Sequence, residues 1–208
     1  MKKIYLVIVV VVAVIGYFVY TSILKPQLDN RTVTAVVPMT IKSSDTSLEF
    51  TYPSGEDGYS LIEPPVPEGL SDGLRKVYIL MDTHDYIEFQ KDKNGDTPPT
   101  VSVFVLDFPN SLYGLNGLTE DSKRIDKLKA WAQKYTKYSS YNQKTAEPEE
   151  VKLDGALTLH YLTKGDYQQD VYVVMYNGKV YVFNGQFTKD KENIHKMFKE
   201  LIGSVVFD

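Results

Sequence analysis

The chain has 208 residues, no cysteine and a formal net charge of −4 at pH 7. Without cysteine there is no disulfide, no thiol catalysis and no iron–sulfur site, and the acidic balance argues against a nucleic-acid partner, which needs a basic surface. The length suits one folded domain of roughly 160 residues, which is large enough to bury a hydrophobic core without disulfides. The remaining residues would form a shorter segment outside this domain.

An uninterrupted apolar segment opens the chain. No charged residue lies within residues 4–24, and this run matches the ~20 residues that a helix needs to cross a bilayer core. It is longer than the apolar core of a cleaved signal peptide, and no small-x-small cleavage pattern follows it. Residues 1–25 are therefore predicted to be an uncleaved transmembrane anchor. Lys2 and Lys3 precede the span, which favours a cytoplasmic N-terminus and a single-pass protein of the cell membrane whose C-terminal domain is extracytoplasmic.

Residues 26–45 are predicted to be a linker, because Pro26 and Pro38 interrupt them and their end is polar. Within the linker, residues 32–37 alternate weakly, and pairing as an edge strand stays open for them. The folded domain is predicted over residues 46–208. Three of the 23 Lys and Arg residues precede residue 26 and all 27 Asp and Glu follow it, so the remainder carries a net charge of −7.

The first half of this domain reads as short strands. Alternating or β-branched and aromatic runs between turn residues indicate extended segments. These predicted strands cover residues 47–52, 59–62, 77–81, 86–89 and 100–108. The prolines within residues 64–67 prevent regular pairing, so this stretch is predicted to be a loop.

A helical period follows. Apolar residues at three- and four-residue spacing predict a helix from Thr119 to Tyr138. Its apolar stripe contains Ile125, Leu128, Trp131, Ala132, Tyr135 and Tyr138. Strands are predicted again over residues 151–153 and 156–162, and a second amphipathic helix over residues 189–202, followed by a last strand at residues 205–207.

The clearest local signal is Asn177-Gly178 between two strand-like runs. This dipeptide is typical of a type I′ hairpin, because both central residues need positive φ. The two-residue turn predicts that Tyr176 faces Lys179 and that Tyr172 faces Phe183. Both faces of such a hairpin are apolar, so we expect a central position with cover on both sides. The predicted fold class is α+β: an antiparallel β-sheet flanked by helices on its faces.

Three stretches resemble the PsbP-like fold, known from extrinsic photosystem subunits and from bacterial surface proteins of unknown role. They are residues 50–59, residues 154–187 and residues 204–207, including Phe50-Thr51-Tyr52-Pro53-Ser54-Gly55, Asp154-Gly155-Ala156 and Ser204-Val205-Val206-Phe207. The resemblance spans about residues 46–207. It implies a binding or assembly role and transfers no functional residue, because the family has no common catalytic constellation.

Two groups of residues are candidates for function. Asp82, His84 and Asp85 gather two carboxylates and an imidazole, a set able to bind a metal or to act in acid–base catalysis. The chain also has 16 tyrosines, and Tyr113, Tyr138 and Tyr141 are the ones expected to be exposed for contact with a partner.

The favoured hypothesis is a non-enzymatic, membrane-anchored, extracytoplasmic binding or assembly module. We expect it to contact the membrane through residues 4–24 and a protein partner in the envelope, with no catalytic residue, metal or cofactor. One alternative is an envelope hydrolase or metal-dependent enzyme that uses Asp82, His84 and Asp85. Another is a glycan-binding surface domain that uses exposed tyrosines.

Overall fold

The computed structural model describes residues 36–67, 72–92, 96–108 and 120–208. The predicted anchor, residues 26–35 of the predicted linker and Tyr113 lie outside these ranges. Among the described residues, no helix combines the length and the hydropathy that a bilayer crossing requires.

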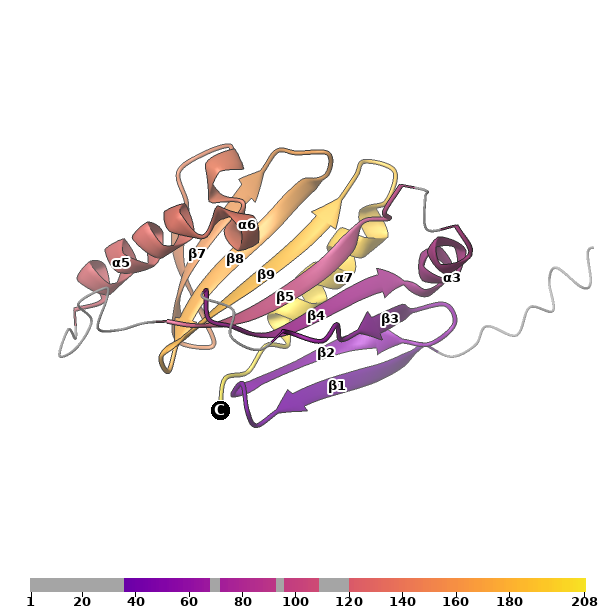
Figure 1. Ribbon diagram of the computed structural model, residues 1–208, viewed down its shortest axis with the longest axis horizontal. Coiled ribbons are helices and arrows are strands. Elements are labelled where there is room, and N and C mark those ends of the chain that lie inside the picture. Colours follow the sequence, from indigo (N-terminus) through magenta and orange to yellow (C-terminus); the bar gives the residue numbers. More distant parts are fainter. Residues whose placement is uncertain (1–35, 68–71, 93–95, 109–119) are drawn as a thin grey trace, which may run out of the picture. The chain divides into compact units, whose positions relative to one another are not determined.

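A single sheet of nine strands organises the domain (Figure 1), in the order β1-β2-β3-β4-β5-β9-β8-β7-β6. The strands are β1 (Val37–Ser43), β2 (Leu48–Ser54), β3 (Tyr59–Ile62), β4 (Leu74–Asp82), β5 (Thr100–Asp107), β6 (Glu149–Leu153), β7 (Ala156–Thr163), β8 (Gln168–Tyr176) and β9 (Lys179–Phe187). Neighbouring strands are antiparallel except β2 and β3, which run parallel and share only the pair Ser54 and Tyr59. The architecture is α+β.

Helices lie against both faces of the sheet, as the apolar hairpin predicts. They are α3 (Thr83–Lys91), α5 (Asp121–Lys134), α6 (Thr136–Ser139) and α7 (Glu192–Gly203), with a 3₁₀ turn η2 (Tyr141–Gln143). Successive residues of β9 divide between two cores. Tyr181 and Phe183 pack in the cluster that contains α7, whereas Val180 and Val182 pack in the cluster that contains α5. The helices α5 and α7 therefore cover opposite faces (Figure 1).

The β8–β9 hairpin confirms the predicted register. Tyr176 faces Lys179 and Tyr172 faces Phe183. The backbone φ values of Asn177 and Gly178 are 43° and 71°, as a type I′ turn requires.

The N-terminal edge of the sheet differs from the prediction. The structure has a strand at Val37–Ser43, which occupies part of the range assigned to the linker; of the stretch 32–37, residues 32–35 lie outside the described residues. The strand pairs along its whole length with β2. The side chain of Ile41 packs against the α7 core, and Thr40 Oγ1 lies 3.0 Å from Thr51 Oγ1. These contacts explain why a segment with a proline and weak alternation still joins the sheet.

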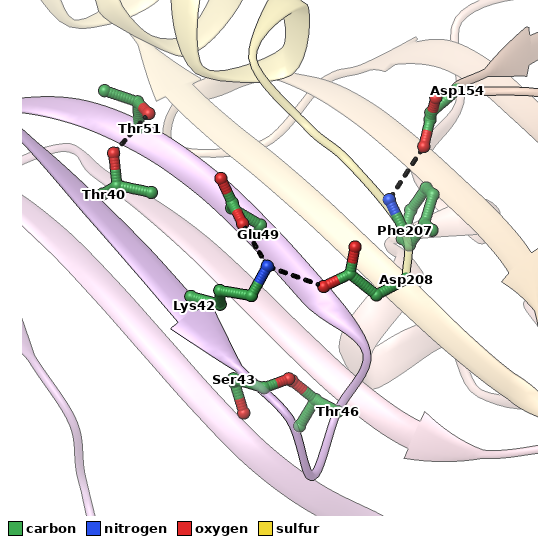
Figure 2. A network of polar contacts seen from close by, with 9 residues as sticks. All are labelled: Thr40, Lys42, Ser43, Thr46, Glu49, Thr51, Asp154, Phe207 and Asp208. Carbon is green, nitrogen blue, oxygen red and sulfur yellow. Dashed lines mark hydrogen bonds and ion pairs between the residues drawn. The ribbon is translucent and has the colours of Figure 1, made fainter.

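The edge of β2 that faces away from β1 is hydrogen-bonded to the C-terminal residues of the chain. Glu49 and Val206 exchange two backbone hydrogen bonds of 2.9 Å, and the Thr51 amide donates to Ser204 Oγ at 2.9 Å. Figure 2 shows Lys42 between Glu49 and Asp208, with its Nζ 3.0 Å from a carboxylate oxygen of each. The predicted strand at residues 205–207 is thus a single bridge to β2.

Two further elements correct the predictions. Residues 86–89 were expected to form a strand but belong to α3, because Asp82 caps that helix and starts it. The predicted helix over 119–138 is divided at Tyr135 into α5 and α6. The Ser139 hydroxyl donates to the Ala132 carbonyl at 2.7 Å and satisfies one of the acceptors that the break leaves open.

Candidate functional site

The side chains of Asp82, His84 and Asp85 have separate partners. The Asp82 carboxylate accepts the backbone amides of His84 and Asp85 at 2.9 and 3.3 Å. His84 Nε2 lies 3.4 Å from Asp57 Oδ1, and Asp85 forms an ion pair with Lys191.

Two of these three residues line one small cavity. The cavity has a volume of about 220 Å³, and its lining includes Asp82 and Asp85 but not His84. Among the described residues, no group of three His, Asp or Glu is placed to hold a metal ion. The arrangement therefore fixes the start of α3 and does not bring the imidazole and both carboxylates to a common point.

Tyr138 and Tyr141 were predicted to be exposed. This prediction is wrong, because their exposed fractions are 7% and 5%. The Tyr138 hydroxyl donates to Asp72 at 2.7 Å, and its ring lies 5.3 Å from that of Phe104. The Tyr141 ring meets the Tyr161 ring edge-on at 5.4 Å. Both rings close the α5 core and present little surface to a partner.

A buried carboxylate with two histidines forms a cluster that sequence reasoning missed. Asp170 on β8 has a side chain only 5% exposed. Its Oδ1 lies 2.8 Å from Nε2 of His160 on β7, and its Oδ2 lies 2.9 Å from Nε2 of His195 on α7. The cluster thus connects two strands to the helix that covers them.

Electrostatics favour an ionised Asp170. Burial alone would raise its pKa, but the hydrogen bonds from His160 and His195 and their charges outweigh burial, so the pKa lies below the usual value. The hydrogen bond to Asp170 raises the pKa of His160 above 6.5, against the opposing effect of burial and with a smaller contribution from Glu149.

The rings of the two histidines are fixed in orientation. His160 stacks on Tyr172 with ring centroids 4.3 Å apart, and His195 stacks on Phe187 at 4.0 Å and 3°. An ionised carboxylate accepts hydrogen bonds only, so both Nε2 atoms carry the proton. In a neutral His195 the Nδ1 atom is then the unprotonated one.

An open cavity of about 570 Å³ adjoins His195 and forms, with the Asp170 cluster, the candidate site. We call it the α7 cavity. Its lining comprises Gln168, Phe187, Thr188, Lys189, Glu192, Asn193, His195, Lys196 and Lys199. The start of β8, the end of β9, the connection after β9 and the first turns of α7 supply these residues. Eight of the nine lining residues have polar or charged side chains and three of them are lysines, so the chemistry suits binding of a polar or anionic group.

A signal for this site exists in the sequence. Asp170 is the one charged residue directly before the apolar run at residues 171–175, and a carboxylate buried in such a strand needs partners. The identity of those partners depends on strand register and on helix placement, which local patterns do not provide.

Comparison with known proteins supports the fold. No protein-family model matches the chain, and neither does any curated protein. The solution structure of cyanobacterial PsbP (CyanoP) from Synechocystis sp. PCC 6803 is similar over 85% of this chain and 96% of that chain, with 20% identity and a TM-score of 0.50. A crystal structure from Bacteroides thetaiotaomicron VPI-5482 aligns with 81% of this chain and 48% of that chain, at 11% identity and a TM-score of 0.41. From the sequence motifs, the nine-stranded sheet and the match to CyanoP, we conclude that the chain has a PsbP-like fold.

Proposed function

We propose that this protein is a non-enzymatic binding or assembly module, anchored in the membrane by residues 4–24 with its folded domain outside the cytoplasm. The α7 cavity is the observation that carries the binding role. It offers several hydrogen-bond donors around a space large enough for a ligand group or a partner side chain. The neighbouring Asp170 is hydrogen-bonded to His160 and His195, and the second of these bonds fixes the orientation of the His195 ring, which lines the cavity.

Anchoring and orientation rest on the sequence. The apolar run has the length of a span, and Lys2 and Lys3 lie on its N-terminal side. A protease added to cells with permeabilised outer barriers and an intact bilayer should remove the folded domain. Full protection under these conditions would place the domain in the cytoplasm and contradict the proposal.

The binding role is tested by comparing variants of the full chain. Partner capture from membranes should weaken when Lys189 and Lys199 are both changed to Gln, because both side chains line the α7 cavity. Lys134→Gln is the matched control, since Lys134 lies on α5, over the Tyr135 ring and on the opposite face. Equal capture by all three proteins would contradict the assignment of the binding surface.

The enzyme hypothesis has a separate test. A hydrolase that uses Asp82, His84 and Asp85 needs them at one point, whereas they have separate partners here. Hydrolysis that is lost in His84→Gln but kept in Asp57→Asn would favour the enzyme over the binding module, since Asp57→Asn alters the same contact but leaves the imidazole in place.

A further inference from the structure

Two lysines of the α7 cavity, Lys189 and Lys199, are not paired with a carboxylate among the described residues. The lining contains three lysines and one carboxylate, Glu192. Among the described residues Lys189 and Lys199 have no ion-pair partner, and Lys196 reaches Glu200 only at 4.0 Å. Lysines elsewhere in the domain mostly have close carboxylates. Examples are the pairs Lys42–Glu49, Lys76–Glu63, Lys129–Glu150 and Lys152–Asp121.

His195 adds a directed group to this surface. Its Nε2 donates to Asp170 and its ring is stacked on Phe187, so these two contacts fix the orientation of the imidazole. The Nδ1 atom has no protein partner among the described residues, and it becomes an N–H donor when the ring is protonated.

The charged groups around this imidazole come from several elements. Asp170 on β8 faces its Nε2, with His160 on the far side of that carboxylate. Glu192, Lys196 and Lys199 belong to its own helix, and Lys189 precedes that helix. Lysines outnumber carboxylates on the cavity side, which is the side that a ligand would approach.

We propose that the α7 cavity binds an anionic ligand through the oxygen atoms of a phosphate or carboxylate group. Lys189 and Lys199 supply charge, and the His195 ring lies at the same surface in a fixed orientation. Asn193, Gln168 and Thr188 offer neutral hydrogen bonds at the same surface. A volume of about 570 Å³ exceeds that of a bare oxyanion, so the cavity has room for the rest of a molecule that carries such a group. This inference rests on the proposed binding function and specifies the ligand class.

The test uses the three histidines of the full chain as reporters. The protein is held in phosphatidylcholine nanodiscs with labelled histidine rings, and inorganic phosphate is titrated against sodium chloride of matched ionic strength. The ring signal of His195 should shift with saturation in phosphate only. The His84 signal should not shift, because that ring lies at Asp57, away from the cavity lining. A shift that chloride reproduces, or one without saturation, would overturn the proposal.

Variants separate ligand contact from folding. Changing Lys189 and Lys199 to Gln should raise the dissociation constant for phosphate by roughly fivefold or more, the sum expected from two exposed charge contacts. An unchanged His160 signal verifies that the Asp170 cluster is intact in the variant. Lys134→Gln should bind like the parent protein. Equal affinity of the double variant and the parent would refute the assignment of these lysines.

A last comparison identifies the source of the anion. Nanodiscs that contain phosphatidylglycerol, without added phosphate, should shift the His195 signal if a lipid head group is the ligand. A response to soluble phosphate alone indicates a small soluble ligand, and either result supports the anionic class. No response in either arm overturns it. Partner capture that still depends on Lys189 and Lys199 would then leave the proposed binding function standing.

Discussion

Adding one methyl group at Gly185 should displace α7 from the sheet. Gly185 lies on β9 directly opposite Asp170 of β8, on the face that α7 covers. A Cβ atom at this position would lie 2.4 Å from Cγ and 2.6 Å from Cδ1 of Phe198. Carbon atoms in contact prefer about 3.5–4.0 Å, so the ring would have to retreat by about 1 Å. Phe198 is 0% exposed, so its ring is enclosed by other residues and any movement must displace them.

The expected cost of Gly185→Ala is about 3 kcal/mol, at the upper end of the usual range for overpacking. For a domain of this size such a loss corresponds to a fall in Tm of roughly 6–12 °C. Urea and thermal unfolding measure both quantities. His195 lies three residues before Phe198 on α7, less than one helical turn away. The same shift of α7 should therefore weaken the hydrogen bond from His195 to Asp170 and change the NMR signal of the His195 ring.

Gly203→Ala is the matched control. A Cβ atom at Gly203 meets nothing within 4 Å, and alanine favours a helix by about 1 kcal/mol over glycine. This variant should be as stable as the parent or slightly more stable. Phe198→Leu should partly rescue Gly185→Ala, with a clear coupling energy between the two changes. A Gly185→Ala protein as stable as the parent would refute the argument that this glycine sets the approach of α7.

Other changes test the edge, the turn and the cluster. Gly178→Val should destabilise the domain by roughly 1 kcal/mol or more, because a β-branched residue resists positive φ; an unchanged urea midpoint would contradict the turn type. A fragment that starts at Ser44 should have a lower urea midpoint than one that starts at Val36, and it should aggregate more, because it lacks β1 and exposes the outer edge of β2. Equal midpoints would show that β1 adds nothing. The raised pKa of His160 gives stability that is complete below the unfolded value of 6.5 and is lost as the pH rises through the higher folded value. Parent stability should therefore fall more than that of His160→Gln as the pH rises from below 6.5 into the alkaline range, and parallel pH profiles would refute this linkage.

Local chemistry explains which parts of the fold could be predicted. The β8–β9 hairpin follows from Asn177-Gly178, because the turn sets the register without help from the rest of the chain. The helix expected over residues 189–202 exists as α7 at Glu192–Gly203, because its apolar period is strong. The prediction of a strand at residues 86–89 was wrong, because the helix N-cap at Asp82 outweighs the strand propensity of the aromatic and β-branched residues that follow it.

The candidate site depends on contacts between distant segments. The pairing of β7 with β8 brings His160 next to Asp170. His195 reaches Asp170 only when α7 packs on the sheet face that carries these two residues. No short pattern joins these three residues. The burial of Tyr138 and Tyr141 was missed for a related reason, since the residues that enclose their rings, Phe104 and Tyr161, belong to separate strands.

The bridge between Glu49 and Val206 also constrains the order in which the domain can be completed. Residues 48–54 leave the ribosome long before residues 204–207, so the inner edge of β2 must wait with unpaired backbone groups while most of the chain is made. Pairings between distant parts of a chain form slowly. During synthesis, the β1–β2 hairpin is therefore open to a wrong strand partner until residues 204–207 arrive, and a chaperone that shields extended segments would protect this edge.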